Sequence, residues 1–218
     1  MHAFLSLLAL PLVSGAGLAD PDRFARWEPD IAAIEKRLKE APPKESSVFF
    51  VGSSSIRLWN VPKSFPGLAA ANVGFGGSEI ADSTHFVARI VVPYKPKTIV
   101  FYAGDNDIAN GRTPEQVAAD FKAFYEAVHK DLPKCRVLFI AVKPSPLRWK
   151  RFDEQKKANA LVKEACQADA RLGFVDIVPK MLGPDGMPIR KLYAIDGLHL
   201  SPAGYELWTA EVLPALEK

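Results

Sequence analysis

The sequence predicts an α/β fold in which a parallel β-sheet lies between two layers of helices. Two observations support this prediction. Several continuous apolar runs end abruptly in glycine, proline or polar residues, which is typical of parallel strands buried on both faces. Between them lie amphipathic segments whose apolar residues recur three and four positions apart, as in helices. Strands that alternate with helices need crossover connections, and these produce a parallel sheet covered on both sides.

The elements can be placed along the chain from these two patterns. We expect five strands, at residues 47–52, 71–73, 99–103, 137–142 and 173–176. The expected helices span residues 23–40, 79–90, 114–132, 151–170 and 202–216. Pro29 falls inside the first helical pattern and can kink or split it. Thr113 and Ser201 each stand as an N-cap before a proline, which marks a helix start.

Length and composition indicate one globular domain. The chain has 218 residues, of which 48% are hydrophobic and 24% charged. These values suit a single domain with a sizeable core over residues 20–218. The formal net charge is only +3 and no long basic run occurs. We therefore expect no nucleic-acid partner.

Residues 1–19 differ from the rest of the chain. A short apolar core at residues 4–13 is followed by small residues, and Gly17 and Ala19 suit the positions before a cleavage site. The run is short for a bilayer span. We predict a signal peptide here, with an uncleaved interfacial helix as the alternative. No later segment has the pattern of a transmembrane helix, so we expect a protein exported to the periplasm or secreted, without stable membrane insertion.

Cysteines and metal ligands give little further information. The chain has two cysteines, Cys135 and Cys166. In an exported protein they could form a disulfide, and two free, partly buried thiols are equally compatible with the sequence. No spacing typical of a metal site occurs, and we expect neither a metal nor a cofactor.

Polar clusters follow the predicted strands at the edge where ligands gather in open parallel sheets. Residues 53–55 are three serines after the first strand, and residues 74–78 form a glycine-rich segment after the second. Residues 104–107 read Gly-Asp-Asn-Asp after the third strand. Asp196 and His199 come after the last strand, on a segment that can reach the same edge.

These residue types suit hydrolysis through a serine nucleophile. A serine hydroxyl needs a base to take its proton, and His199 is the natural one. Asp196 can hold the second imidazole N–H and stabilise the imidazolium. An oxyanion needs fixed donors, which the Gly77 backbone, the Asn106 amide and the backbone N–H of the serine itself can supply.

Four motifs of the chain occur in an order typical of one enzyme family. They are VGSSSIRLW at 51–59, NVGFGG at 72–77, GDND at 104–107 and DGLH at 196–199. With these motifs the chain resembles the SGNH (GDSL-type) hydrolases over nearly its whole length after residue 19. The resemblance implies a three-layer, flavodoxin-like α/β/α sandwich and an esterase or lipase activity without a cofactor.

The first motif departs from the usual Gly-Asp-Ser-Leu/Ile of the family. Aligned without a gap, Gly52 and Trp59 match, and the nucleophile falls on Ser54, with Ser53 in place of the aspartate. Sliding by one position would select Ser55 instead. We favour Ser54 because a gap inside a strand-to-helix turn would alter its geometry.

The resemblance thus implies a catalytic triad of Ser54, Asp196 and His199. It also implies an oxyanion hole formed by Ser54, Gly77 and Asn106. Substrate-binding residues stay open, because four side chains could either line a pocket or simply pack: Arg57, Trp59, Arg148 and Trp149.

Each candidate also has a plain structural interpretation. The three serines could form a turn with a helix cap, and Asp196 could cap a turn beside a packed His199. Asp105 and Asp107 suit Asx turns. Asp176 and Asp185 are alternative acids for the triad, although neither lies as near His199 in the sequence.

From these residues we expect an exported serine esterase that acts through an acyl-enzyme. The resemblance implies esters of carbohydrates, lipids or thiols as substrates. Because the sequence shows no long apolar lid, small acyl groups such as acetyl on a carbohydrate are the first expectation. The alternatives are a lysophospholipase or thioesterase of the same family, and a non-catalytic glycan-binding module on the same fold.

Overall fold

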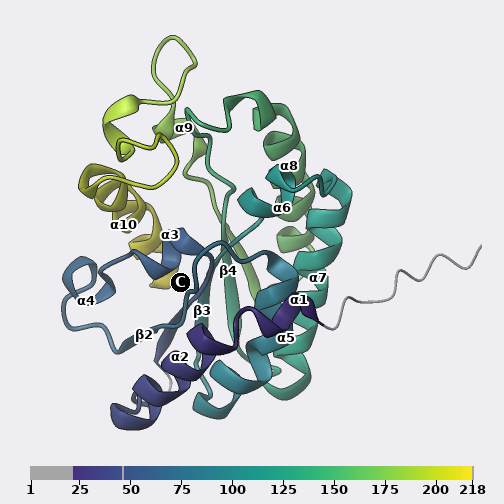
Figure 1. The fold of residues 1–218 in the computed structure, drawn as a ribbon, viewed down its shortest axis with the longest axis vertical. Helices are drawn as coiled ribbons and strands as arrows, with labels where there is room; N and C mark the ends of the chain where they lie inside the picture. Colours follow the sequence, from purple (N-terminus) through teal and green to yellow (C-terminus); the bar gives the residue numbers. More distant parts are fainter. Residues whose placement is uncertain (1–21, 46, 218) are drawn as a thin grey trace, which may run out of the picture.

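Five parallel strands form the centre of the protein (Figure 1). This computed structural model describes residues 22–45 and 47–217. The strands are β1 (Val48–Gly52), β2 (Ala70–Asn72), β3 (Thr98–Tyr102), β4 (Arg136–Ile140) and β5 (Leu172–Val175). Their order in the sheet is β2-β1-β3-β4-β5, and all neighbouring pairs are parallel. The predicted flavodoxin-like sheet is therefore confirmed.

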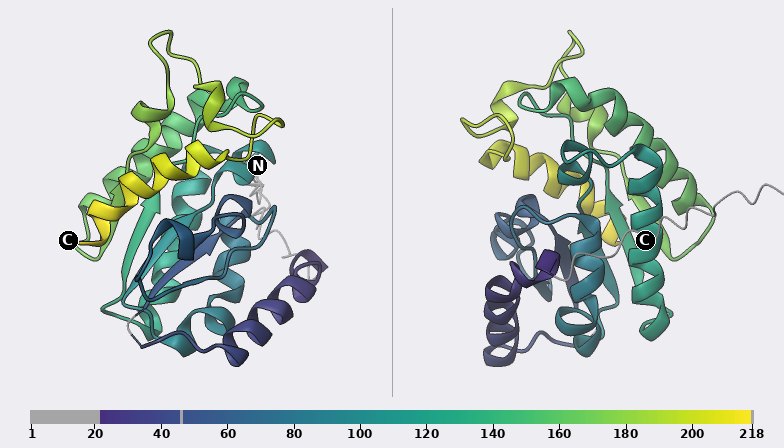
Figure 2. Two further views of the ribbon diagram at one scale, coloured as in Figure 1. Left: turned by 90° about the vertical axis from the view of Figure 1, so that its left-hand side faces the viewer. Right: turned by 45° about the vertical axis from the view of Figure 1, so that its right-hand side comes forward.

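Helices cover both faces of this sheet and make the three layers (Figure 2). One face packs against α2 (Glu28–Glu40), α5 (Ile80–Ile90), α7 (Pro114–Asp131) and α8 (Phe152–Gln167). The other packs against α3 (Ser54–Arg57), α4 (Val61–Ser64), α9 (Val178–Met181) and α10 (Pro202–Leu216). Successive strand side chains point to opposite cores, so Phe49 lies in one cluster and Phe50 in the other. Both clusters are apolar, which explains the continuous hydrophobic runs of the strands.

The first predicted helix is split in two. The structure has α1 (Asp22–Ala25) and α2, with Trp27 between them. Pro29 lies in the first turn of α2, where its missing N–H has no intrahelical acceptor in any case. The proline thus starts the second helix.

Some short elements were not predicted. Residues 104–107, expected as a turn, contain the start of α6 (Asp105–Ala109), and three 3₁₀ turns join other elements: η1 (Val92–Tyr94), η2 (Trp149–Arg151) and η3 (Arg190–Leu192). These pieces are too short to show a helical period in the sequence.

The predicted signal peptide, residues 1–19, lies outside the described residues. Within the described part of the chain, no helix has the length and apolar character that a membrane crossing requires. The sheet order reverses between β1 and β3, since β1 is followed by β2 on one side and β3 on the other. The carboxyl ends of these two strands are the usual place for a ligand site in such sheets.

Candidate active site

A sharp turn at the end of β1 presents Ser54. Gly52 has φ +136°, and a Cβ built there would lie 2.0 Å from the Tyr102 carbonyl oxygen, so only glycine fits. The next residue, Ser53, donates its N–H to that carbonyl at 3.0 Å. Ser54 then begins α3 as its first residue. The nucleophile candidate is held where the strand becomes a helix.

Two side chains from distant elements fix α3 in place. The Asn72 amide at the end of β2 donates to the carbonyls of Ile56, at 2.6 Å, and Trp59, at 3.1 Å. From α10, the Tyr205 hydroxyl donates to the Ser55 carbonyl at 3.0 Å. The orientation of α3 therefore depends on both the sheet and the last helix.

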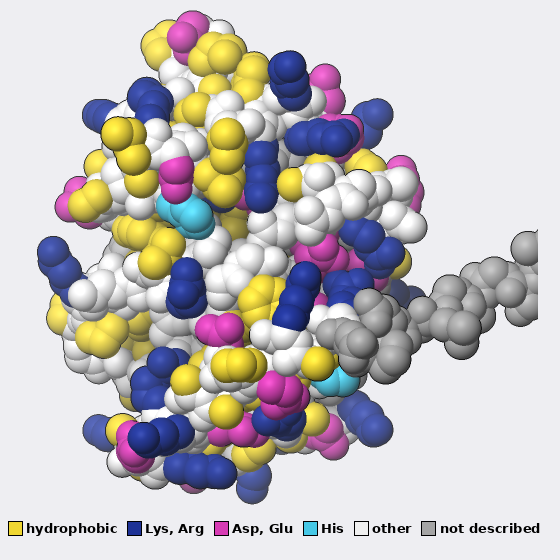
Figure 3. Space-filling view, viewed as in Figure 1, with side chains coloured by type: hydrophobic (Ala, Val, Ile, Leu, Met, Phe, Trp, Pro, Cys, Tyr) yellow, Lys and Arg dark blue, Asp and Glu magenta, His cyan; other side chains and the backbone are white. Residues whose placement is uncertain are grey.

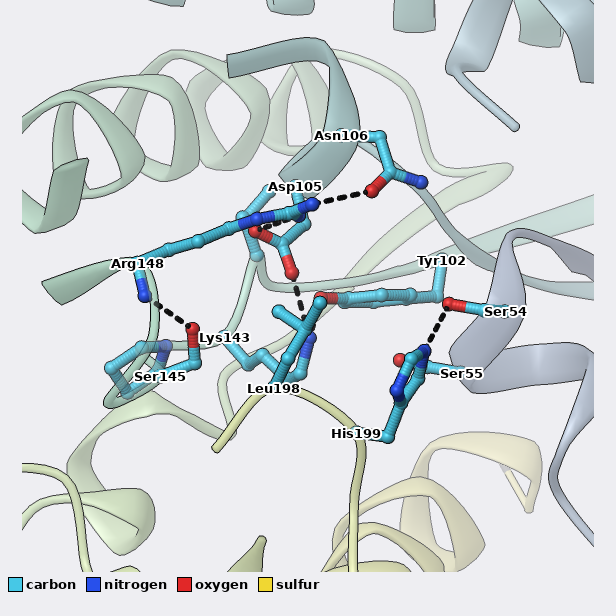
Figure 4. Close-up of polar contacts among 12 residues, drawn as sticks. Ser54, Ser55, Tyr102, Asp105, Asn106, Lys143, Ser145, Arg148, Leu198 and His199 are labelled. Atoms are coloured by element: carbon cyan, nitrogen blue, oxygen red, sulfur yellow. Dashed lines mark hydrogen bonds and ion pairs between the residues drawn. The ribbon is translucent and has the colours of Figure 1, made fainter. Parts of the chain in front are cut away.

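The structure brings Ser54, His199 and Asp196 together. His199 Nε2 lies 3.1 Å from Ser54 Oγ (Figure 4). His199 Nδ1 lies 2.6 Å from Asp196 Oδ2. The turn that carries the pair is closed by a hydrogen bond from the Ala194 N–H to the His199 carbonyl, at 2.8 Å. Because the carboxylate accepts the proton on Nδ1, the imidazole presents Nε2 to the serine hydroxyl as an acceptor.

Asp196 is held in its charged form. The hydrogen bond from His199 and those from the backbone of Leu198 and His199 lower the pKa of Asp196 to about 2. Through the two backbone N–H groups, Asp196 also caps its own turn. The expected turn cap and the expected position beside His199 therefore both occur in the structure. A carboxylate that is ionised at all physiological pH values can stabilise an imidazolium next to it.

The neighbouring serines make no hydrogen bond to His199. Ser55 is buried at 2% exposure and contacts Tyr205 through its carbonyl, while Ser53 is the residue before α3 and makes no side-chain capping bond. Of the three, the structure places Ser54 within hydrogen-bond distance of the imidazole.

The residues expected to form the oxyanion hole have three N–H groups without a protein acceptor among the described residues. Within the described residues, the backbone N–H groups of Ser54 and Gly77 have no protein acceptor. The Asn106 amide donates one N–H to the Ser78 carbonyl at 2.9 Å, which leaves its second N–H free. Gly77 has φ +79°, a conformation that glycine adopts without strain.

These donors line a pocket of about 360 Å³ together with Ser54 and His199. Its remaining lining is mostly charged or polar and includes Asp30, Arg57 and Arg148. Of the four open candidates, Arg57 and Arg148 line this pocket, whereas Trp59 is buried at 3% exposure and Trp149 stacks on Phe152. The surrounding surface carries interspersed positive and negative side chains (Figure 3).

A buried ion cluster beneath the pocket was missed by the sequence interpretation. Asp105, expected in an Asx turn, instead lies 2.7 Å from the Lys143 ammonium and 2.8 Å from the Arg148 guanidinium. Burial by itself raises the pKa of the Asp105 carboxyl, but the two cations outweigh it and the pKa is lowered. A charged residue directly after a continuous apolar run, such as Lys143 after the expected strand at 137–142, is the signal that could have revealed the cluster.

Asp107 and the alternative acids have local roles. Asp107 accepts the backbone N–H groups of Gly104, at 2.9 Å, and Ile80, at 3.0 Å. Asp176 and Asp185 each accept an N–H from their own turn, at 3.3 and 3.0 Å. Neither of these two acids contacts His199.

Cys135 and Cys166 are both free and buried, so the structure has thiols at these positions. Burial raises the pKa of each thiol to about 12. Within residues 22–45 and 47–217 no group of three or more His, Cys, Asp or Glu side chains could hold a metal ion.

The sequence of residues 58–207 matches the GDSL-like Lipase/Acylhydrolase family. The chain belongs to this family. The match begins four residues after Ser54, so the placement of the serine in this GDSL-like protein rests on the geometry above. No curated protein matches the chain in sequence.

Solved structures resemble this GDSL-like chain in fold. A putative platelet activating factor from Streptococcus pneumoniae has 19% identity and a TM-score of 0.74, over 88% of this chain and 94% of that one. A GDSL-like lipase from Bacteroides thetaiotaomicron has 22% identity and a TM-score of 0.69, over 89% and 97%. An acetyl-xylooligosaccharide esterase from Geobacillus stearothermophilus has 16% identity and a TM-score of 0.61, over 80% and 95%.

Proposed function

We propose that this GDSL-like protein is a serine esterase that works through an acyl-enzyme. One observation carries the proposal: His199 contacts the Ser54 hydroxyl through Nε2 at 3.1 Å and the Asp196 carboxylate through Nδ1 at 2.6 Å. A hydroxyl, an imidazole and a carboxylate in this order are the parts of an activated serine nucleophile.

In the proposed first step, Ser54 Oγ attacks the ester carbonyl while its proton moves to His199 Nε2. The new Oγ–C bond forms, and the bond from the carbonyl carbon to the alcohol oxygen breaks. The leaving oxygen takes the proton from Nε2 and departs as the alcohol. Water then repeats the sequence on the acyl-enzyme, giving the carboxylic acid and free Ser54.

The charge that develops on the carbonyl oxygen needs donors that are already in position. The N–H groups of Ser54 and Gly77 and the second N–H of Asn106 are the proposed oxyanion hole, since all three residues line one pocket. Fixed donors of this kind are each worth about 10²–10³ in rate.

For the substrate we propose a short acyl group, such as acetyl, on a carbohydrate. The pocket of about 360 Å³ is small and its charged and polar lining suits a hydroxyl-rich alcohol. Two proteins of similar fold are described as an acetyl-xylooligosaccharide esterase and a carbohydrate esterase family 3 member. These likenesses concern the fold, and they agree with the proposed substrate class.

A second candidate is a lysophospholipase or thioesterase that takes long acyl chains. Leu58 and Leu200 line an apolar groove of about 800 Å³, and in the sequence they directly follow Arg57 and His199 of the polar pocket. Trp59, Tyr205 and Leu213 also line this groove. A chain that leaves the pocket along these residues would be shielded from water.

The proposal is tested by labelling and by activity. A fluorophosphonate is expected to add to Ser54 in an intact-protein mass measurement, and Ser54→Ala and His199→Ala are expected to lose hydrolysis of p-nitrophenyl acetate. Ser55→Ala is the matched control, because the Ser55 hydroxyl makes no hydrogen bond to the imidazole. Activity that survives in Ser54→Ala would reject the mechanism, and unmodified, inactive wild-type protein would favour the non-catalytic binding module.

The acyl length is tested separately with p-nitrophenyl esters from acetate to palmitate. A short pocket is expected to give kcat/KM values that fall by more than about tenfold with long chains, since each added methylene that is not accommodated loses binding energy. Rising values, reversed by Leu58→Asp in the apolar groove, would instead support the lysophospholipase or thioesterase candidate.

We also propose that the protein is exported, on the sequence pattern of residues 1–19. Export would bring the site to extracellular carbohydrate esters. N-terminal sequencing of the protein recovered from the periplasm or medium tests this, and an intact Met1 in the cytoplasm would reject it.

A further inference from the structure

The Asn106 side chain is held at both ends of its amide. Its Nδ2 donates to the Ser78 carbonyl at 2.9 Å, and its Oδ1 accepts from Arg148 Nη2 at 2.9 Å. A guanidinium carries only donors, so the atom of Asn106 that faces Arg148 must be the carbonyl oxygen. The amide nitrogen then lies on the other side, with its second N–H available to the pocket.

Arg148 is itself anchored by buried groups (Figure 4). Its Nη1 lies 2.8 Å from Asp105 Oδ1 and forms an ion pair with it, although no N–H of this nitrogen is aligned for a hydrogen bond. The backbone N–H of Arg148 donates to Ser145 Oγ at 3.3 Å. Asp105 also accepts from Lys143 at 2.7 Å and Gln155 at 3.2 Å, and its side chain is only 4% exposed. Lys143 and Gln155 therefore hold the Asp105 carboxylate in place independently of Arg148.

The Arg148 guanidinium bridges two consecutive residues of α6. Asp105 and Asn106 both contact the same guanidinium, which comes from the loop after β4, 42 positions beyond Asn106. A planar fork can hold a carboxylate and an amide oxygen at once, which a single ammonium does less well. Without this contact the amide could rotate and present its oxygen, instead of its N–H, to a developing oxyanion.

From this geometry we infer that Arg148 is a positioning residue that orients Asn106 for the oxyanion hole, with Asp105 as its anchor. The inference rests on the proposed esterase function, and it adds a residue from a loop that contains none of the four family motifs. Arg148 acts through Asn106, so its effect depends on the presence of that amide.

A double-mutant cycle tests this dependence with p-nitrophenyl acetate. Asn106→Ala is expected to lower kcat by about 10²–10³, as for the loss of one oxyanion donor. Arg148→Met is expected to lower kcat by about 10–100-fold with KM changed by less than about threefold, since the contact matters mainly in the transition state. The double variant is expected to be within about twofold of Asn106→Ala alone. Fully additive effects would overturn the inference.

Two controls separate positioning from general damage. Arg151→Met removes an exposed arginine that pairs with Glu154 outside the pocket, and it is expected to leave kcat unchanged. Arg148→Lys keeps the charge but loses the fork, and it is expected to recover only part of the lost kcat. Complete recovery would mean that charge alone matters, which also overturns the inference. In Arg148→Met, Asp105 keeps Lys143 as its partner, so the folded state is expected to persist.

A measurement independent of turnover completes the test. The side-chain amide signals of Asn106, assigned by their absence in Asn106→Ala, are expected to shift and broaden in the NMR spectrum of Arg148→Met. Unchanged signals would show that Arg148 does not hold the amide. If the wild-type protein fails to hydrolyse any ester, the proposed function fails, and the amide signals still decide whether Arg148 fixes Asn106.

Discussion

Asp196 contacts His199 through both of its carboxylate oxygens. Oδ2 lies 2.6 Å from the imidazole Nδ1, while Oδ1 accepts the backbone N–H of His199 at 3.0 Å and that of Leu198 at 2.9 Å. Backbone and side chain of the histidine are thus fixed by one acid three positions earlier. The turn by itself therefore sets the orientation of the imidazole. The rest of the fold only has to bring Ser54 within hydrogen-bond distance of it.

Removing the charge of Asp196 is expected to lower activity strongly while the fold persists. Asp196→Asn should reduce kcat for p-nitrophenyl acetate by about 10²–10⁴, because the imidazolium loses its partner and the Nδ1 proton its acceptor. The pKa of Asp196 is lowered to about 2, so its titration is not expected to shape the rate profile above about pH 4. The exposed Asp185→Asn, which alters only its own turn, is the control. Activity within twofold of wild type would contradict the role of Asp196.

The glycine at the end of β1 is expected to tolerate no side chain. Gly52→Ala would place a Cβ 2.0 Å from the Tyr102 carbonyl oxygen at a φ of +136°, and the expected loss of unfolding free energy is more than about 4 kcal/mol, or failure to fold. Gly67→Ala is the matched control, because its φ is +82° but nothing lies within 4 Å. Gly67→Ala should lower the free energy of unfolding by about 1 kcal/mol, because only the left-handed backbone conformation is unfavourable for alanine there. Urea unfolding measures both, and equal losses would refute the steric argument.

Buried Asp107 predicts a stability that falls with rising pH. Burial raises the pKa of its carboxyl to about 7, whereas an unfolded aspartate titrates near about 3.9. Between these values the folded protein keeps a proton that the unfolded chain has lost. The free energy of unfolding should therefore fall as pH rises through this window, by at most about 4 kcal/mol.

Urea unfolding across this pH range checks the sign. In Asp107→Asn the decrease of the free energy of unfolding with pH should disappear. The variant can still be less stable at every pH, because one backbone N–H loses its acceptor. Asp169→Asn is the control, since hydrogen bonds from Arg171 lower the pKa of Asp169 to about 2, below the window. The same slope in wild type and Asp107→Asn would rule out this aspartate as the cause.

The two thiols are expected to be unreactive in the folded protein. Burial raises the pKa of Cys135 and Cys166 to about 12, so at pH 8 the thiolate fraction is on the order of 1 in 10⁴. Reaction with Ellman's reagent should be slow in buffer and should release two equivalents of thionitrobenzoate in urea. Fast release of one equivalent in buffer would mean that one thiol is accessible, and no release in urea would mean a disulfide.

The strands and the meeting of the four motifs could be predicted from the sequence. Strands β1, β3 and β4 are buried on both faces, so each is a continuous apolar run with a clear end. The ungapped match of Gly52 and Trp59 selected Ser54, and the structure places this serine beside His199. Strand ends and the Asp196 turn depend on neighbouring residues, whereas the motif match selected Ser54, which meets His199 across 145 positions.

The cluster around Asp105 was not predicted because its partners are distant in the sequence. Lys143 follows Asp105 by 38 positions, and Arg148 lies further along the same loop after β4. Nothing near Asp105 in the sequence therefore distinguishes an ion pair from an Asx turn. The five-residue helix α6 likewise shows no period of its own. The lining of the pocket depends on such encounters between loops, which is why the substrate-binding residues stayed open.

Ser54 and His199 are separated by 145 positions, and α10 joins them through the contact between Tyr205 and the Ser55 carbonyl. During synthesis on the ribosome, the serine turn emerges long before the imidazole that would activate it. A nascent chain can complete its sheet while it still lacks a base. The proposed catalytic centre can therefore form only after His199 has been synthesised, and a chain released before that residue carries the serine without the imidazole that would take its proton.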